Sequence, residues 1–166
     1  VDLRIGKEIL KGTADSYRRL RNTLRFTLGS LAGFDEAERV APEEMPELER
    51  WVLHRLAELD HTVRRGYDRY DFQGVFQTLF TFCTVDLSAF YFDIRKDALY
   101  CDAPSSTKRL SAVKVVRHLF DHLVTWLAPM LPFTTEEAWL ERNPDSASVH
   151  LEQFPVVPAE WKNEAL

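Results

Sequence analysis

Apolar residues recur at three- and four-residue steps near the start of the chain, as they do along one face of an α-helix. The stripe consists of Ile9, Leu10, Tyr17, Leu20, Leu24, Leu28 and Leu31. It predicts one long helix from Ile5 to Leu31. Pro42 and Pro46 cannot continue this helix, because proline lacks an N–H donor and clashes with the preceding turn. The acidic stretch from Gly33 to Pro46 is therefore predicted to be a loop.

The same period returns in three later segments. A second helix is predicted from Glu47 to Tyr70, with Pro46 suited to its first position. Asp71 can cap a third helix, whose apolar stripe from Phe72 to Phe90 is wide and aromatic. Such a stripe is typical of a helix that is covered on more than one side, so this helix is expected at the centre of the fold. A fourth helix is predicted from Thr107 to Leu127.

The remaining chain has weaker signals. Residues 134–137, Thr-Thr-Glu-Glu, have the spacing of a capping box and predict the start of a short fifth helix. After Pro144 the pattern is irregular, with Val149–Leu151 as a short extended piece. The fold class predicted is all-α, an antiparallel bundle of about four to five helices. Residues 1–142 form this helical domain, and residues 143–166 form a C-terminal tail that leads to a further domain downstream.

Composition supports this interpretation. Among 166 residues, 45% are hydrophobic, and only 6 glycines and 8 prolines interrupt the chain, which excludes a disordered or collagen-like protein. The two cysteines are too few for a disulfide framework or a four-cysteine zinc site, so a reducing compartment is expected. There is no export signal and no run of about 20 apolar residues. The sequence predicts a cytoplasmic protein without a membrane span.

The net charge of −5 is unevenly distributed. Residues 1–28 contain seven Lys/Arg against three Asp/Glu, whereas residues 29–50 contain two against seven. A basic N-terminal segment on an acidic protein favours focused binding to phosphate over a generally adhesive surface.

The sequence contains almost none of the motifs that are typical of catalytic sites. There is no glycine-rich phosphate loop, no HExxH, no CxxC and no GxSxG motif. His118 and His122 have the spacing of two metal ligands on a helix, but a third ligand is not nearby, and solvated helix surface is the interpretation we adopt. Cys83 lies on the apolar stripe of the third helix, where a buried, inert thiol is expected. The sequence predicts neither a catalytic residue nor a metal site.

The segment Tyr17–Phe26 contains four arginines. With about 100° per residue, its polar side chains and Phe26 lie roughly opposite the leucine stripe, and one arginine lies at the flank. The opposite side chains are Arg18, Arg19, Asn22 and Arg25, and Arg21 lies at the flank. Guanidinium groups pair with phosphate and base edges, and asparagine can read a base edge, so this face is a candidate for RNA contact. A solvated basic face, or arginines held by acidic partners within the bundle, are the alternatives.

Asp86 falls within the apolar stripe of the third helix. A buried carboxylate is costly unless it is paired and hydrogen-bonded. We hypothesise that Arg21 or Arg25 is its partner, with Asp86–Arg25 as the expected structural ion pair. Trp51 is interpreted as a core anchor in preference to a stacking platform for a base.

Three motifs together resemble a known family. In order along the chain, YRRLRNTLRF, CTVDLSAFYFDIRKDALYCD and LAPMLPFTTEEAW are similar to the anticodon-binding domain of the class I isoleucyl-tRNA synthetases. The last motif is shared with the synthetases for valine, leucine and methionine, so the equivalent domain of a sister enzyme such as valyl-tRNA synthetase is an alternative. The first two motifs favour isoleucine.

This resemblance implies a fragment that binds the anticodon stem-loop of an isoleucine tRNA. The parent enzyme would use ATP and Mg to ligate isoleucine to that tRNA. The chain has neither a HIGH nor a KMSKS signature, so no catalysis and no cofactor are expected of it alone. Its expected partners are tRNA and the other domains of the parent enzyme.

Residue roles follow partly from the resemblance. It implies that Tyr17 and Arg21 face the anticodon. A second basic cluster, Lys108, Arg109 and Lys114, is a candidate for contact with the stem backbone. Two other classes of protein compete with RNA binding: a protein-interaction bundle, and a small metal- or thiol-dependent enzyme.

Overall fold

Helices make up most of the chain, as the spacing of apolar residues predicts. The structure is a computed structural model that describes residues 4–33 and 40–166. Its main helices are α1 (Lys7–Leu31), α2 (Glu47–Asp68), α3 (Phe72–Thr81), the π-helical η2 (Phe82–Tyr91), α4 (Phe92–Cys101), α5 (Thr107–Leu127) and α6 (Pro132–Arg142). Short 3-10 turns are η1 (Pro42–Glu44), η3 (Val149–Leu151) and η4 (Ala159–Trp161). No strand is formed within these described ranges.

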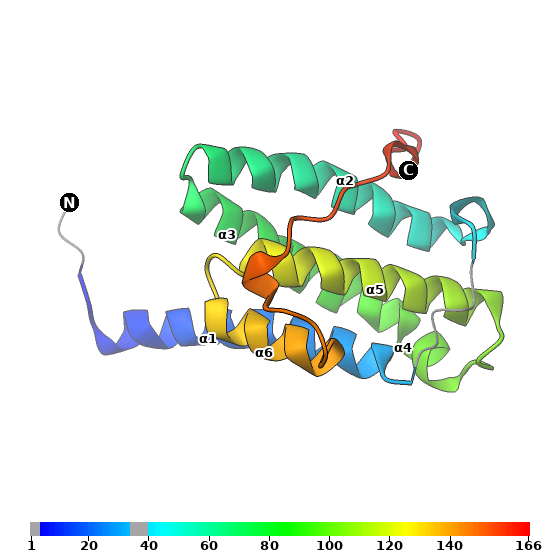
Figure 1. Cartoon of the computed structure of the whole chain (residues 1–166), viewed down its shortest axis with the longest axis horizontal. Coiled ribbons are helices and arrows are strands. Elements are labelled where there is room, and N and C mark those ends of the chain that lie inside the picture. The colour runs from blue at the N-terminus through cyan, green and yellow to red at the C-terminus, as the bar shows by residue number, and fades with distance from the viewer. Residues whose placement is uncertain (1–3, 34–39) are drawn as a thin grey trace.

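The helices run up and down beside one another (Figure 1). The segments α3, η2 and α4 follow without a break as one helix of 30 residues. Helix α5 packs against α1, α2, α4 and α6. The predicted all-α antiparallel bundle with an irregular C-terminal tail is therefore confirmed.

The central helix is α5, so the prediction that the third helix is central was wrong. Helix α5 buries residues on every side, among them Val115, Phe120 and Trp126, which are inaccessible to solvent. In the third helix, Val85 and Phe90 remain 55% and 44% exposed. A π-helical stretch shifts the angular position of successive side chains, so the wide aromatic stripe does not all face one neighbour.

The predicted and observed starts of a helix agree where a capping side chain accepts a hydrogen bond from the first turn. The Asp71 side chain accepts a hydrogen bond from the Gly74 amide at 2.9 Å, as predicted. Helix α5 covers the predicted residues, with the Ser106 hydroxyl accepting from the Arg109 amide at its start. Between α1 and α2, residues 34–39 lie outside the described part of the chain, and Pro42–Glu44 form a turn within the predicted loop.

The predicted capping box at residues 134–137 was wrong. Helix α6 begins two residues earlier, at Pro132. Glu137, the acid of that predicted box, lies beside Arg21 of α1, and its neighbour Glu136 accepts hydrogen bonds through Oε2 from the Ser148 hydroxyl and the Val149 amide, both at 2.9 Å. These bonds hold Val149–Leu151 in a 3-10 turn, so the extended piece predicted there was also wrong.

The N-terminal part of α1 projects beyond the other helices (Figure 1). Ile9 and Leu10 are 54% and 58% exposed there, although the apolar stripe predicts their burial. The periodicity of the stripe is correct, but no helix of the described chain covers its first turns.

The C-terminal tail returns along the bundle (Figure 1). Its Trp161 and Val149 are buried in the core, with 6% and 2% exposed. Arg64 Nη2 of α2 donates to the Pro155 carbonyl at 2.9 Å and lies over the Phe154 ring. The tail therefore helps to cover the bundle, while its division from the helical domain after residue 142 stays a prediction.

In the part of the chain that the structure describes, one helix has the length and composition of a membrane span. This is the continuous helix Phe72–Cys101. Core helices of soluble proteins share these properties, and this helix packs against α1, α2 and α5. Its polar residues Asp86 and Arg95 pair with side chains of α2, which fits a helix inside the bundle.

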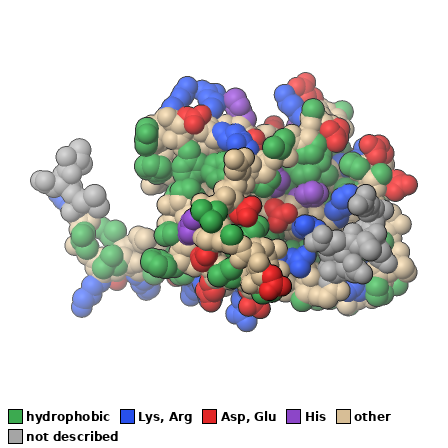
Figure 2. Space-filling model, viewed as in Figure 1, with side chains coloured by type: hydrophobic (Ala, Val, Ile, Leu, Met, Phe, Trp, Pro, Cys, Tyr) green, Lys and Arg blue, Asp and Glu red, His purple; other side chains and the backbone are tan. Residues whose placement is uncertain are grey.

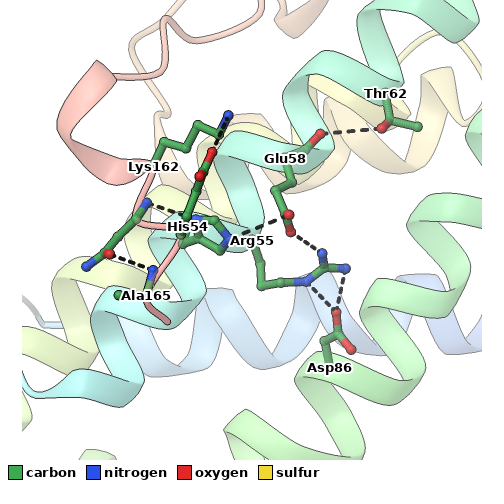
Figure 3. Close-up of polar contacts among 9 residues, drawn as sticks. His54, Arg55, Glu58, Thr62, Asp86, Lys162 and Ala165 are labelled. Atoms are coloured by element: carbon green, nitrogen blue, oxygen red, sulfur yellow. Dashed lines mark hydrogen bonds and ion pairs between the residues drawn. The ribbon is translucent and has the colours of Figure 1, made fainter.

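Asp86 pairs with Arg55, not with the predicted Arg25 or Arg21 (Figure 3). Arg55 Nε and Nη2 each donate to Asp86 Oδ2 at 3.2 Å, and its Nη1 donates to Glu58. The Asp86 carboxylate points toward Arg55 of α2. The requirement for an arginine partner was correct, but its identity was not.

We expect Asp86→Asn to lower the free energy of unfolding by about 1–2 kcal/mol, because a hydrogen bond to a charged group is weakened and Arg55 loses part of its charge balance. Arg25→Ala should change it by less than about 0.5 kcal/mol, as exposed substitutions do. Urea denaturation of both variants measures the difference. Equal destabilisation by the two would contradict the observed pairing.

A second ion pair is more deeply buried. Glu49 of α2 is inaccessible to solvent, and Arg95 of α4 donates to both its carboxylate oxygens, with Nη2 at 2.9 Å from Oε2. The Tyr91 hydroxyl also donates to Glu49 Oε1, at 3.1 Å. Burial, and then the Glu49 charge, raise the pKa of Tyr91 well above its ordinary value. The phenol therefore stays protonated and keeps donating to the carboxylate.

Two histidines of α5 are enclosed by the tail. The Trp161 ring lies edge-on to His118, with ring centroids 4.7 Å apart, and also contacts His122. Burial, and after it the neighbouring charges of His122, Lys114 and Arg117, together lower the pKa of His118 to about 4. His118 is therefore neutral in the folded protein at neutral pH.

Acid should unfold the protein partly through His118. The unfolded chain takes up this proton near pH 6.5 and the folded chain only near pH 4, so stability is lost as pH falls between these values. We expect a loss of about 2 kcal/mol from this group by about pH 5. Urea denaturation of the native protein and His118→Gln at several pH values tests it. The two proteins would show the same pH dependence if His118 contributed nothing.

Candidate nucleic-acid interface

Helix α1 has one buried and one open face. The buried face consists of Leu20, Thr23, Leu24, Thr27 and Leu31. The two threonine hydroxyls donate to backbone carbonyls of their own helix, so burial leaves neither of these two hydroxyls unsatisfied. The open face exposes the polar side chains selected from the sequence: Arg18, Arg19, Arg21, Asn22 and Arg25.

These arginines form few hydrogen bonds or ion pairs with other described residues. Arg18 pairs with Asp15 one turn earlier, at 2.8 Å, and both side chains are more than half exposed. Arg21 lies 3.7 Å from Glu137 of α6. The side chains of Arg19 and Arg25 form no hydrogen bond or ion pair with the described residues. The structure therefore does not support the alternative in which acidic partners within the bundle hold these arginines.

A groove of about 350 Å³ runs between α1 and α6. Its lining residues are Arg21, Leu24, Arg25 and Leu28 from α1, and Thr134, Glu137, Ala138 and Glu141 from α6. Guanidinium groups therefore lie along one helix and carboxylates along the other, with aliphatic side chains between them. Such a groove offers hydrogen-bond donors, acceptors and an apolar surface to one ligand.

Two aromatic residues lie where α1 meets the start of α6. The Tyr17 hydroxyl is hydrogen-bonded to Thr134 Oγ1 at 2.7 Å, and its side chain is 39% exposed. Phe133, the residue before Thr134, is 89% exposed. Tyr17 thus lies at the edge of the groove, and its contact with an anticodon, which the resemblance implies, stays a prediction. Sequence reasoning missed Phe133, because an apolar residue beside a helix start gives no signal for exposure.

Phe26 does not belong to the open face. Its ring stacks on Phe92 of α4, with centroids 4.1 Å apart, and packs against the core. The helical wheel placed it opposite the leucines, but α4 covers that side of α1 at this level. Phe26 is therefore not available for stacking on a base.

The second basic cluster is divided by the structure. Arg109 Nη1 donates to the Asp102 carbonyl, and Lys114 Nζ donates to the Val40 carbonyl at 2.6 Å. Lys108 is exposed at the start of α5. This end of the bundle is opposite to the projecting end of α1 (Figure 1). Two of the three cations thus hold loop backbone, and contact of this cluster with RNA stays a prediction.

The residues considered for catalysis, metal binding or base stacking are packed inside the protein. Cys83 is fully buried, and burial raises the pKa of its thiol to about 12. His122 is also buried, not part of a solvated surface, and its Nδ1 lies 2.7 Å from the His118 carbonyl. Trp51 packs against the core and meets Phe90 edge-on, as expected for an anchor. Among the described residues, no three His, Cys, Asp or Glu side chains form a group that could hold a metal.

Opposite charges lie close together over the surface seen in Figure 2. No single charge predominates on this face, so electrostatic attraction of a phosphate would have to come from a local arrangement such as the arginines of α1.

Comparison with known proteins shows which family the sequence matches. Residues 49–166 match the family described as the anticodon-binding domain of tRNA ligase. The chain is 66% identical over 165 residues to isoleucine–tRNA ligase of Mesorhizobium japonicum, 62% over 165 residues to that of Agrobacterium fabrum, and 64% over 164 residues to that of Ruegeria pomeroyi. These alignments cover 98–99% of the chain, α1 included, but only 16–17% of the relatives.

Proposed function

This chain belongs to the family of anticodon-binding domains of tRNA ligases, and on that premise we propose that the open face of α1 and the adjoining groove bind the anticodon stem-loop of a tRNA. One observation carries the proposal. The arginines of α1 project from the bundle, and Arg19 and Arg25 have no partner among the described residues. Phosphates of a hairpin would supply the missing counter-charge.

The RNA would be a single-stranded loop with its stem. Guanidinium groups neutralise the backbone, while Asn22 and the exposed rings of Tyr17 and Phe133 suit unstacked bases. Carboxylates on α6 would keep phosphates on the α1 side of the groove, because like charges repel. The hairpin would therefore lie along α1.

We further propose that the whole protein is an isoleucine–tRNA ligase, because the relatives with this name align with 98–99% of the chain. Its ATP- and Mg-dependent ligation of isoleucine would take place in domains outside this chain. The chain itself would serve only to position the tRNA. The other domains would be partners in cis. We place the enzyme in the cytoplasm, where tRNA is aminoacylated.

Filter binding with RNA hairpins tests this function. We expect the chain to bind an isoleucine anticodon stem-loop weakly, and to lose much of its affinity between about 50 and about 200 mM salt, because counterion release supplies most of the binding free energy. A hairpin with a scrambled loop should bind less tightly. Equal affinity for the two hairpins would contradict anticodon recognition, and absence of binding would favour the protein-interaction bundle.

Two arginine variants should separate phosphate contact from base contact. Arg18→Ala is expected to weaken binding of all hairpins and to reduce the salt slope by about 1, as loss of one phosphate contact does. Arg21→Ala is expected to cost about 1–3 kcal/mol and to relax the preference for the anticodon loop. Titrations at several salt concentrations measure both effects.

Lys162→Ala provides the matched control. Lys162 is an exposed cation on the tail, 63% accessible, and lies outside the groove. The Lys162→Ala substitution should leave both the affinity for the hairpin and the salt slope unchanged. Equal effects of all three substitutions would indicate binding through general charge and not through α1.

A further inference from the structure

The groove between α1 and α6 has walls of opposite charge. Arg21 and Arg25 line it from α1, and Glu137 and Glu141 line it from α6. We propose that this groove seats one base of a single-stranded RNA loop and selects it by its exocyclic amino group, with Glu137 as the acceptor. This inference rests on the proposed function and adds which class of base is chosen.

The two walls are not locked together. Arg21 Nη2 lies 3.7 Å from Glu137 Oε2, which is longer than a hydrogen bond, and the side chains are 47% and 70% exposed. Exposed ion pairs of this kind contribute little to stability. A base edge can therefore replace the Arg21–Glu137 contact at small cost and make a charge-assisted hydrogen bond to each side chain.

The chemistry of the walls limits the bases that fit. An edge that satisfies both walls needs an acceptor for the guanidinium and an amino group for the carboxylate. Adenine offers N7 beside its N6 amino group, and cytosine has an N4 amino group, whereas uracil has none. Carboxylates accept from such amino groups and cannot donate in return. The groove should thus prefer a base that carries an amino group.

The apolar part of the groove suits the ring of a base. Leu24 and Leu28 of α1 and Ala138 of α6 lie between the charged walls. Its volume of about 350 Å³ is within the range of sites for small molecules. A phosphate has no apolar surface to pack against these side chains, and Glu137 and Glu141 would repel it. A base is therefore the better occupant.

A panel of modified hairpins tests the proposal with the full chain. In an isoleucine anticodon stem-loop, each amino-bearing loop base is replaced in turn by its analogue without the amino group, such as purine for adenine. For the native protein, we expect one replacement to weaken binding by about tenfold, as loss of a good base contact does. In Glu137→Ala the same replacement should have no effect.

Two further variants complete the test. Glu137→Gln keeps an acceptor oxygen and should retain part of the discrimination, whereas Glu152→Ala, at an exposed tail position outside the groove, should retain all of it. The inference would be overturned if every replacement had the same effect on the native protein and on Glu137→Ala, or if only charge mattered and Glu137→Gln behaved as Glu137→Ala. Failure of the native protein to bind the unmodified hairpin would overturn the proposed function as well.

Discussion

Glu49→Ala is expected to lower the free energy of unfolding by about 3–5 kcal/mol, because removing one member of a buried ion pair leaves the other charge uncompensated. Arg95 donates to both oxygens of this carboxylate, and a guanidinium stays protonated without its partner, so the variant leaves a charge uncompensated. The Tyr91 hydroxyl would lose its acceptor as well. Urea or guanidinium denaturation followed by circular dichroism measures the effect.

Two controls separate the ion pair from helix propensity. Glu47→Ala changes an exposed glutamate in the first turn of α2 and should have an effect within about 0.5 kcal/mol. The double variant Glu49→Leu/Arg95→Met replaces both charges by apolar groups and should recover most of the lost stability. A double variant as unstable as Glu49→Ala would show that the pair has a role beyond mutual neutralisation.

Phe120→Ala is the second substitution with a large expected effect, about 3–5 kcal/mol. Its side chain is inaccessible to solvent on α5, which packs against α1, α2, α4 and α6. Truncation there removes apolar contacts and leaves a cavity that rigid neighbours fill only in part. Thermal or chemical denaturation should show a large loss without a change in the all-helical spectrum.

Phe133→Ala is the matched control, because Phe133 is 89% exposed and should affect stability by less than about 0.5 kcal/mol. Its effect should instead appear in hairpin binding if a base stacks on this ring. Similar destabilisation by Phe120→Ala and Phe133→Ala would contradict the central position of α5.

Much of the candidate interface could be predicted from the sequence. Arg18, Arg19, Asn22 and Arg25 are exposed on α1 as their angular positions indicate, since residues on one helix keep a fixed angular relation. The three family motifs led to the family that the comparison then showed. The groove could not be predicted, because α6 supplies half of its lining and lies more than one hundred residues later in the chain. Phe133 was missed because an apolar residue beside a helix start gives no signal for its exposure.

The sequence by itself determined where α2, α3 and α5 begin and which side of α1 is polar. These features depend on side chains within a few residues of one another: the apolar period, prolines, and caps such as Asp71 and Ser106. Only the tertiary structure decided that Asp86 pairs with Arg55, that Arg95 neutralises Glu49, and that α5 is the central helix. These depend on how far each helix is rotated and shifted against its neighbours. The π-helical turn of η2 changes that rotation, and no local spacing records it.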